Sequence, residues 1–361
     1  MSKSSGPGLR LGAIAGRPLA AALILAALVI PCAVSAQPAA ELYDKAKQEG
    51  ALVIYGGGPT SLYEVPARAF EQDFPGIKVT IHAGFSNVHN QTINAQLKAS
   101  ALDADLAILQ TAGDFIVWKQ QGVLAVYRPE GWDAIDQTFK DPDGHYVGVF
   151  VTAVAYAYNP NLVKAADVPK SALDFLKPEF RGMAISCYPH DDDITLYLFN
   201  TIVRRYGWEW MDKYVANGAA FIQGHLGVAR AISVGEKSVT IDSNPNLSLR
   251  EKRAGKPTEI AFSEIDPTPV WAQTAATFNA SPHPNAARLF LSWWLRKEQQ
   301  AKLDTWSVRV DVPPPEGLPP LLSLALANRY PQFLADTAAI AELRKRFEAI
   351  TGPVRASGGV R

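Results

Sequence analysis

Residues 146–163, YVGVFVTAVAYAYNPNLV, carry the most informative hydrophobic pattern of the chain. Their first part is rich in β-branched and aromatic residues and lacks proline, which predicts a strand that ends at the turn signal Asn159-Pro160. A strand of roughly ten or more residues is long, because five or six is usual. We therefore expect this strand, near residues 152–158, to carry the chain from one lobe of the protein into another.

Upstream of this strand, short apolar runs alternate with amphipathic stretches. Residues 52–55, 78–82 and 105–109 predict strands, and each is followed by a stretch that predicts a helix. The first two helices are expected at residues 61–74 and 90–100. Strands and helices that alternate at this spacing predict an α/β fold with a mainly parallel sheet.

A second α/β unit is predicted after Pro160. Its strands are expected at residues 182–187, 239–242 and 259–262, with helical patterns between them. A second crossing between the lobes is expected within residues 267–278, where the chain returns.

Two long helices are expected after this return, at residues 285–305 and 330–350. We therefore assign residues 37–153 and 275–361 to lobe 1, and residues 154–274 to lobe 2.

Composition narrows the class of protein. Hydrophobic residues make up 48% of the 361 positions, which is enough for sizeable cores. The 35 basic and 35 acidic residues balance to a net charge of +0. This balance gives no general attraction to nucleic acid or to an anionic membrane, so we expect neither as a partner.

Residues 1–36 have the layout of an export signal. Positive charge comes before an apolar run at residues 18–30 that is too short to span a membrane, and the small residues 34–36 precede the cleavage point. The basic residues are Lys3, Arg10 and Arg17. We expect the signal to be cleaved and the mature protein to reside in the periplasm.

Cleavage after Ala36 would remove Cys32 and leave Cys187 as the single cysteine. No internal disulfide can then form. We expect Cys187 to be a small buried hydrophobic residue.

Several segments, taken in order behind the export signal, resemble one family. They are residues 42–50 and 52–55 (LYDKAKQEG and LVIY), Tyr158-Asn159-Pro160 with Pro169, residues 174–182 (DFLKPEFRG), and residues 283–291 (HPNAARLFL). In this combination the chain resembles the periplasmic substrate-binding proteins of ABC importers, in the extracellular solute-binding group that includes ferric-ion binders.

The resemblance implies a two-lobed periplasmic-binding-protein fold, with mainly parallel sheets and hinge crossover strands, that closes over a ligand. It implies a binding protein that captures a small-molecule solute and delivers it to an ABC transporter permease. We accordingly expect no enzymatic activity, no cofactor and a monomer.

Loops after the first three predicted strands hold candidate ligand-binding residues. In open α/β sheets, ligands bind at the carboxyl ends of strands. Glycine lets backbone N–H groups approach a ligand, and a helix start favours an anion. The candidates are Gly58, Thr60, Ser61, Ser86, Asn87 and Thr111. The alternative for each is a tight turn or a local helix cap.

The acidic run Asp191-Asp192-Asp193 after His190 could bind a metal or a cationic ligand. Adjacent residues on a helix do not all face one way, so we select only Asp191 and Asp192 as candidates and no metal site. The alternative is an acidic helix start, which is favourable to the helix dipole.

Asn244 follows the predicted strand at residues 239–242 and could bind an organic ligand, or serve as a turn residue before Pro245. By position, this loop resembles the one in which ferric binders of the family carry adjacent tyrosines. No two tyrosines are adjacent in this mature chain, and this departure argues against ferric iron. Tyr156 and Trp271, at the two expected crossings, could wall the cleft or pack in the core.

Two other functions remain open from the sequence. One is a secreted metal-dependent hydrolase that uses His190 and the acidic run, although the motifs HExxH and G-x-S-x-G are both absent. The other is a ferric or other metal-ion binding protein. The charge of the ligand also stays open, because helix starts favour an anion while the acidic run favours an amine.

Overall fold

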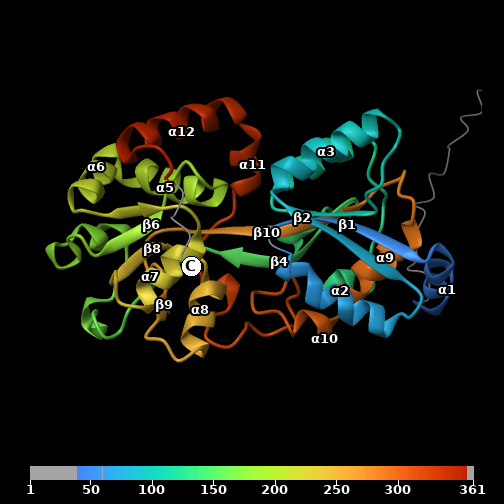
Figure 1. The fold of residues 1–361 in the computed structure, drawn as a ribbon, viewed down its shortest axis with the longest axis horizontal. Helices are drawn as coiled ribbons and strands as arrows, with labels where there is room; N and C mark the ends of the chain where they lie inside the picture. Colours follow the sequence, from blue (N-terminus) through green and yellow to red (C-terminus); the bar gives the residue numbers. More distant parts are fainter. Residues whose placement is uncertain (1–38, 59, 356–361) are drawn as a thin grey trace, which may run out of the picture. The chain divides into compact units, whose positions relative to one another are not determined.

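The computed structural model describes residues 39–58 and 60–355. The predicted export signal lies outside these residues. The described part of the chain contains two β-sheets with helices packed on them (Figure 1).

The first sheet has a parallel core. β1 (Ala51–Gly57) lies between β2 (Lys78–Gly84) and β3 (Leu106–Leu109), and both pairings are parallel. β10 (Thr268–Thr277) pairs antiparallel with both β3 and β4 (Val147–Ala153) and parallel with β11 (Leu326–Ala327).

The second sheet is also mixed. β6 (Ala184–Cys187) pairs in parallel with β7 (Ala220–Ile222) and with β8 (Val239–Ser243). β5 (Ala155–Tyr158) pairs antiparallel with β8 and with β9 (Glu259–Ala261). The predicted α/β class is confirmed, with parallel cores flanked by antiparallel strands.

The stretch predicted as one long strand forms two strands in two sheets. β4 belongs to the first sheet and β5 to the second, and only Val154 separates them. The backbone N–H of Val154 donates to the carbonyl of Pro269 at 2.9 Å, so this single residue contacts the start of β10. The prediction that the chain passes between its halves within residues 152–158 is confirmed (Figure 1).

The return passage begins earlier than the sequence suggested. All pairing partners of β10 are in the first sheet, whereas β9 pairs with β5 in the second sheet. The chain therefore changes sheet between Ala261 and Thr268, just before and at the start of the predicted segment. The proposed lobe boundaries stay a prediction.

Most helices lie close to where periodicity placed them. Their bounds are α1 (Ala39–Glu49), α2 (Ser61–Asp73), α3 (Ser86–Lys98), α4 (Ala112–Gln120), α5 (Asp193–Tyr206), α6 (Trp208–Ala216), α7 (His225–Ser233), α8 (Pro245–Arg253), α9 (Pro284–Trp294), α10 (Lys297–Gln300), α11 (Tyr330–Ala335) and α12 (Thr337–Thr351). Short 3-10 turns occupy Trp132–Ala134, Gln137–Phe139, Ala165–Asp167, Ala172–Leu176, Pro178–Phe180 and Leu321–Ser323. No helix among the described residues is long and apolar enough to cross a membrane.

Both long helices predicted near the C-terminus are interrupted. The first ends at Trp294, before the short helix α10. The second is split at Asp336, whose side chain accepts a hydrogen bond from the backbone of Ala339 at 3.0 Å and so begins α12 as a cap. α11 and α12 contact α5 and α6, which connects the end of the chain with the second sheet (Figure 1).

A buried carboxylate fixes the start of β3. Asp105 is fully buried and accepts hydrogen bonds from the backbone of Val53 at 2.7 Å and from the Ser281 hydroxyl at 2.7 Å. It also accepts from the backbone of His283 at 2.7 Å and contacts Nδ1 of that ring at 2.8 Å. One side chain thus links β1 to the loop that leads into α9.

We expect Asp105→Ala to lower the free energy of unfolding by about 3 kcal/mol or more, because several buried donors lose their acceptor together. Urea denaturation followed by tryptophan fluorescence measures this. Asp133→Ala is the matched control, since Asp133 is exposed, and it should change stability by less than about 0.5 kcal/mol. Equal stability of the two variants would contradict the assigned role of Asp105.

Candidate functional site

The strand directions bring loops of both sheets to one place. β10 is antiparallel to both β3 and β4, so β3 and β4 run the same way, toward Val154. In the second sheet β5 leads away from Val154, and β8 runs antiparallel to it. The carboxyl ends of β1, β2 and β3 therefore lie on the crossing side of the first sheet, and those of β6 and β8 lie on the crossing side of the second. This is where an open α/β sheet binds its ligand.

The candidates after β1 differ in whether their polar groups are already hydrogen-bonded within the protein. Gly58 has a φ of +107°, which favours glycine, and its N–H donates to the carbonyl of Gly84 at 2.7 Å. Thr60 is exposed and makes no side-chain cap bond with α2. Ser61 begins α2, and its side chain lies outside the described part of the chain.

The two candidates after β2 differ in burial. The side chain of Ser86 is buried, and its Oγ accepts a hydrogen bond from the backbone of Gln110 at 3.1 Å, which ties the loop after β2 to the end of β3. Asn87 is exposed and accepts from the backbone of its neighbour Val88 at 2.9 Å. The buried Ser86 therefore holds the loop in place, whereas the side chain of Asn87 is exposed to solvent.

Gln273 was missed by the sequence reasoning. It is buried in β10, and its Nε2 donates to the carbonyl of Gly57 at 2.8 Å and contacts the hydroxyl of Tyr63 at 2.9 Å. A Cβ added at Gly57 would lie 2.0 Å from Oγ of Ser86, so only glycine fits there. A single amide side chain in the middle of this buried strand was the available signal.

Thr111 brings another missed residue into the site. Its hydroxyl donates to the carboxylate of Asp114 at the start of α4. Burial, together with the nearby charge of Asp193, raises the pKa of Asp114 to about 6. Asp114 belongs to the first sheet's layer, whereas Asp193 begins α5 beside the second sheet.

The residues of the acidic run after β6 have different roles. Asp192 is the cap of α5 and accepts from the backbone of Ile194 at 2.8 Å and of Thr195 at 3.2 Å. Burial raises the pKa of Asp192, against the opposing effect of His225. Asp191 accepts from the amide of Gln223 at 3.1 Å. The alternative of an acidic helix start therefore describes Asp192, and ligand contact by either residue stays a prediction.

Asp193 pairs with a residue from the far end of the chain. The guanidinium of Arg344 in α12 donates to Asp193 and to the carbonyl of His190. This pairing offsets the charge of Asp193, whereas Asp114 has no cationic partner among the described residues.

The loop after β8 is closed by its own hydrogen bonds. Asn244 accepts from the backbone of Asn246 at 3.1 Å and caps α8, while the hydroxyls of Ser243 and Ser248 lie 2.8 Å apart. The side chains of Ser243 and Asn244 are therefore both used locally.

The two aromatic candidates have different surroundings. Tyr156 is buried in β5 and packs edge-on against Phe175, with ring centroids 5.0 Å apart. Trp271 lines a cavity of about 410 Å³, together with Gln110 and Tyr330. Lys140 and Arg329 also line this cavity.

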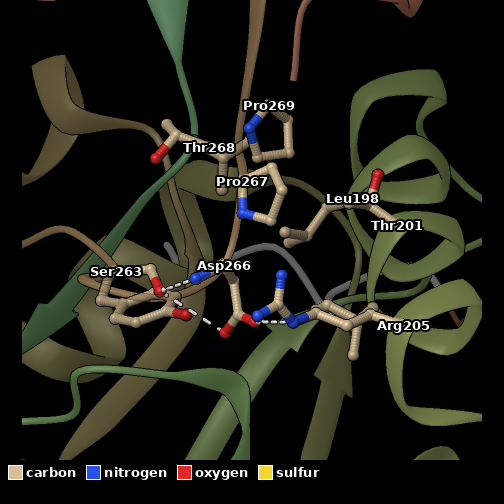
Figure 2. Close-up of a pocket in the computed structure, with 11 residues that line it drawn as sticks. Leu198, Thr201, Arg205, Ser263, Asp266, Pro267, Thr268 and Pro269 are labelled. Carbon is tan, nitrogen blue, oxygen red and sulfur yellow. Dashed lines mark hydrogen bonds and ion pairs between the residues drawn. The ribbon is translucent and has the colours of Figure 1, made fainter. Parts of the chain in front are cut away.

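A much smaller cavity, about 20 Å³, lies where the chain passes between the sheets (Figure 2). Val154 and the segment around Pro267 line it, and Asp266 lies at its edge between Ser263 and Arg205. The carboxylate of Asp266 accepts from the backbone of Ala172 at 2.7 Å and pairs with Nε of Arg205 at 3.2 Å. Asp266 thus anchors the return passage to the second sheet's helices.

A family model for bacterial extracellular solute-binding proteins matches residues 105–305, which is more than half of the chain. The chain belongs to this solute-binding family. This membership makes the chain a solute-binding protein and not an enzyme, so the hydrolase alternative does not apply.

Individual relatives agree with the family match. The solute-binding protein is 23% identical over 269 residues to an Fe(3+)-binding periplasmic protein of Serratia marcescens, covering 72% of this chain and 78% of the relative. It is 21% identical over 223 residues to a probable ABC transporter periplasmic-binding protein of Sinorhizobium fredii, covering 59% of this chain and 61% of the relative.

Solved structures confirm the periplasmic-binding-protein fold. Iron-bound HitA from Pseudomonas aeruginosa superposes with a TM-score of 0.68 at 20% identity, over 82% of this chain and 99% of HitA. AfuA from Actinobacillus pleuropneumoniae, with fructose-6-phosphate bound, gives 0.65 at 20% identity, over 84% and 98%.

The raised pKa of Asp114 predicts a stability that depends on pH. Its ordinary pKa is 3.8, so between about pH 4 and pH 6 the unfolded chain loses this proton before the folded protein does. The contribution to stability is fully present below this window and is lost as pH rises through 6. In the wild-type protein we expect the free energy of unfolding to fall by roughly 1–2 kcal/mol as the pH rises through this window. In Asp114→Asn this fall should be absent. Denaturant titrations at pH 4, 5, 6 and 7 measure it, and identical pH profiles would contradict it.

Proposed function

We propose that this solute-binding protein captures a small organic solute that carries a protonated amine and delivers it to the permease of an ABC importer. The observation that carries the choice of solute is the half-buried carboxylate of Asp114 in the first turn of α4, which has no cationic partner among the described residues. The family supplies the general activity, and this carboxylate supplies the charge preference.

The charge argument follows from the neighbours of Asp114. Thr111 donates one hydrogen bond to it, but burial and Asp193 still hold its pKa near 6. An ammonium group beside Asp114 would favour the ionised carboxylate and lower that pKa. The ammonium group would therefore gain binding energy from the Asp114 carboxylate, which has no cationic partner among the described residues of the free protein.

The opposite side of the site suits the rest of such a solute. The loops after β1 and β2 end at the starts of α2 and α3, where backbone N–H groups favour an acceptor or an anion. Exposed Thr60 and Asn87 offer polar side chains there. A zwitterion fits both sides, and a polyamine fits the acidic side alone.

Capture requires movement about the crossings, and we infer that the lobe built on the first sheet closes against the lobe built on the second sheet, which α11 and α12 also contact. Ligand contacts made only in the closed form shift the population toward it. We also infer that a signal at residues 1–36 is cleaved, and that the mature monomer works in the periplasm.

Ferric iron is the second candidate, because the Serratia marcescens relative is described as Fe(3+)-binding. Two facts weigh against it here. No two tyrosines are adjacent in the mature chain, and Ser243 and Asn244 are held by local hydrogen bonds. The amine therefore fits this chain better than a ferric ion.

Screening primary amines, amino acids, carboxylates, phosphates and ferric iron by thermal shift should identify amines as the stabilising class. At about a hundredfold over its dissociation constant, the solute should raise the free energy of unfolding by about 2.7 kcal/mol. Small-angle scattering should show a smaller radius of gyration with the solute. If only carboxylates or ferric iron stabilise, the amine assignment is wrong. If no ligand compacts the protein, the closing mechanism is wrong.

Asp114→Asn should weaken binding of that amine at least tenfold, which corresponds to losing one hydrogen bond to a charged group. Isothermal titration calorimetry measures the loss. Asp133→Asn is the matched control, because it removes one exposed carboxylate elsewhere and should leave affinity unchanged. Equal losses in both variants would show that only the overall charge matters.

A further inference from the structure

Three different metal-binding side chains meet in the second sheet's layer, apart from the pair used above. Cys187 ends β6, Asp242 lies next to the last residue of β8, and His225 begins α7. Their sulfur, carboxylate oxygen and imidazole nitrogen all lie within 4.8 Å of one another. Cys187 and Asp242 are fully buried, and the His225 side chain is 16% exposed.

The two oxygens of the Asp242 carboxylate have different partners. Oδ2 accepts from the backbone of Cys187 at 3.1 Å and from the hydroxyl of Thr195 at 3.1 Å. Oδ1 faces Nε2 of His225 at 3.0 Å. Hydrogen bonds of this kind, made to one oxygen of a carboxylate, hold it in place for a metal.

The elements that carry the three residues are fixed independently of any ion. β6 and β8 pair directly, which sets Cys187 beside Asp242. Gly224, with a φ of +80°, precedes His225 and lets the chain turn into α7 at this point. The three ligands therefore come from three elements that the sheet itself positions.

A second cluster of similar composition shows the contrast. Asp141, Asp143 and His145 also lie within 4.8 Å of one another, but Lys119 Nζ donates to Asp141 at 2.7 Å and to Asp143 at 2.5 Å. An ammonium group already neutralises that cluster. Among the described residues no lysine or arginine pairs with Asp242, whose partner is the ring of His225, itself one of the three donors.

We propose that Cys187, His225 and Asp242 bind a divalent transition-metal ion of the zinc class. Thiolate, imidazole and carboxylate together are a donor set that Zn²⁺ prefers, whereas Ca²⁺ and Mg²⁺ prefer oxygen ligands alone. Tetrahedral zinc holds its ligand atoms roughly 3.3–3.8 Å apart, so the cluster needs side-chain shifts of about 1 Å. Binding releases the thiol proton, and the proton between His225 and Asp242, to solvent.

This site goes beyond the proposed solute function and does not depend on it. Its fourth coordination position is left for water, which is the arrangement of an open zinc site. The cluster lies at the ends of β6 and β8 on the crossing side, so a bound ion would stiffen the second sheet where its loops face the solute.

Cobalt provides the direct test on the chelator-treated mature protein. Co²⁺ alone should bind at one equivalent and give a thiolate-to-cobalt charge-transfer band in the near ultraviolet with tetrahedral visible bands, and Zn²⁺ should displace it. Cys187→Ser should abolish the charge-transfer band, and Asp242→Asn should weaken Zn²⁺ binding at least tenfold. His145→Gln, in the cluster neutralised by Lys119, is the matched control and should leave both readouts unchanged.

The proposal is overturned if the wild-type protein gives no thiolate band, or if the band persists in Cys187→Ser. Far-UV circular dichroism and thermal melting of each variant confirm that it is folded before it is scored. A folded His225→Gln variant that keeps wild-type Zn²⁺ affinity would overturn it as well. Asp114→Asn, which alters the solute site, should keep full metal binding, so failure of one proposal is distinguishable from failure of the other.

Discussion

The shortest connection between the two sheets is a single residue, and it leaves the chain few ways to arrange its loops. Val154 separates β4 from β5, and its backbone N–H is bonded to Pro269 at the start of β10. Because strand direction cannot reverse across one residue, the strand that leaves the first sheet enters the second still running the same way. The carboxyl ends of the parallel strands are thereby set on the crossing side of both sheets. The position of every candidate ligand-binding loop follows from this connection.

Polar residues near the crossings divide into those that hold the structure and those that remain free for chemistry. Ser86, Gln273 and Asp266 are buried, and each bonds backbone groups of a distant segment. Burying such a group is favourable only when its hydrogen bonds are made, so these residues specify the loop conformations. Asp114 is different, since its hydrogen bonds do not compensate for burial and a neighbouring charge. Unrelieved charge of this kind is typical of sites that bind a ligand.

Much of the fold could be predicted because its signals are local. The apolar runs at residues 52–55 and 105–109 form β1 and β3, and the pattern near residue 154 correctly placed the first crossing. Periodicity failed where a local cap competes with it, as at Asp336, which splits a predicted helix by bonding the backbone of Ala339. Asp336 is present in the sequence, but apolar residues recur at helical spacing on both sides of it. The pattern therefore predicts one uninterrupted helix.

The site was harder to predict, because its partners are distant in sequence. Gln273 acts on Gly57 across the first sheet, and Asp114 is influenced by Asp193 from the other sheet. Cys187 is buried as expected, yet its proximity to His225 and Asp242 has no local signal. Residues chosen for their place after a strand, such as Asn244, do follow a strand in the structure, and ligand contact by them stays a prediction. Position could be predicted from the strand order, whereas contact required the tertiary structure.

The return passage has an unusual backbone. Pro267 and Pro269 flank Thr268, and each proline ring locks its own φ near −65°. Asp266, immediately before them, is anchored to Ala172 and Arg205. Few torsion angles are therefore able to turn in this segment, whereas Val154 lies in a linker without proline. Any swing of one sheet against the other would therefore draw its torsional change mainly from Val154.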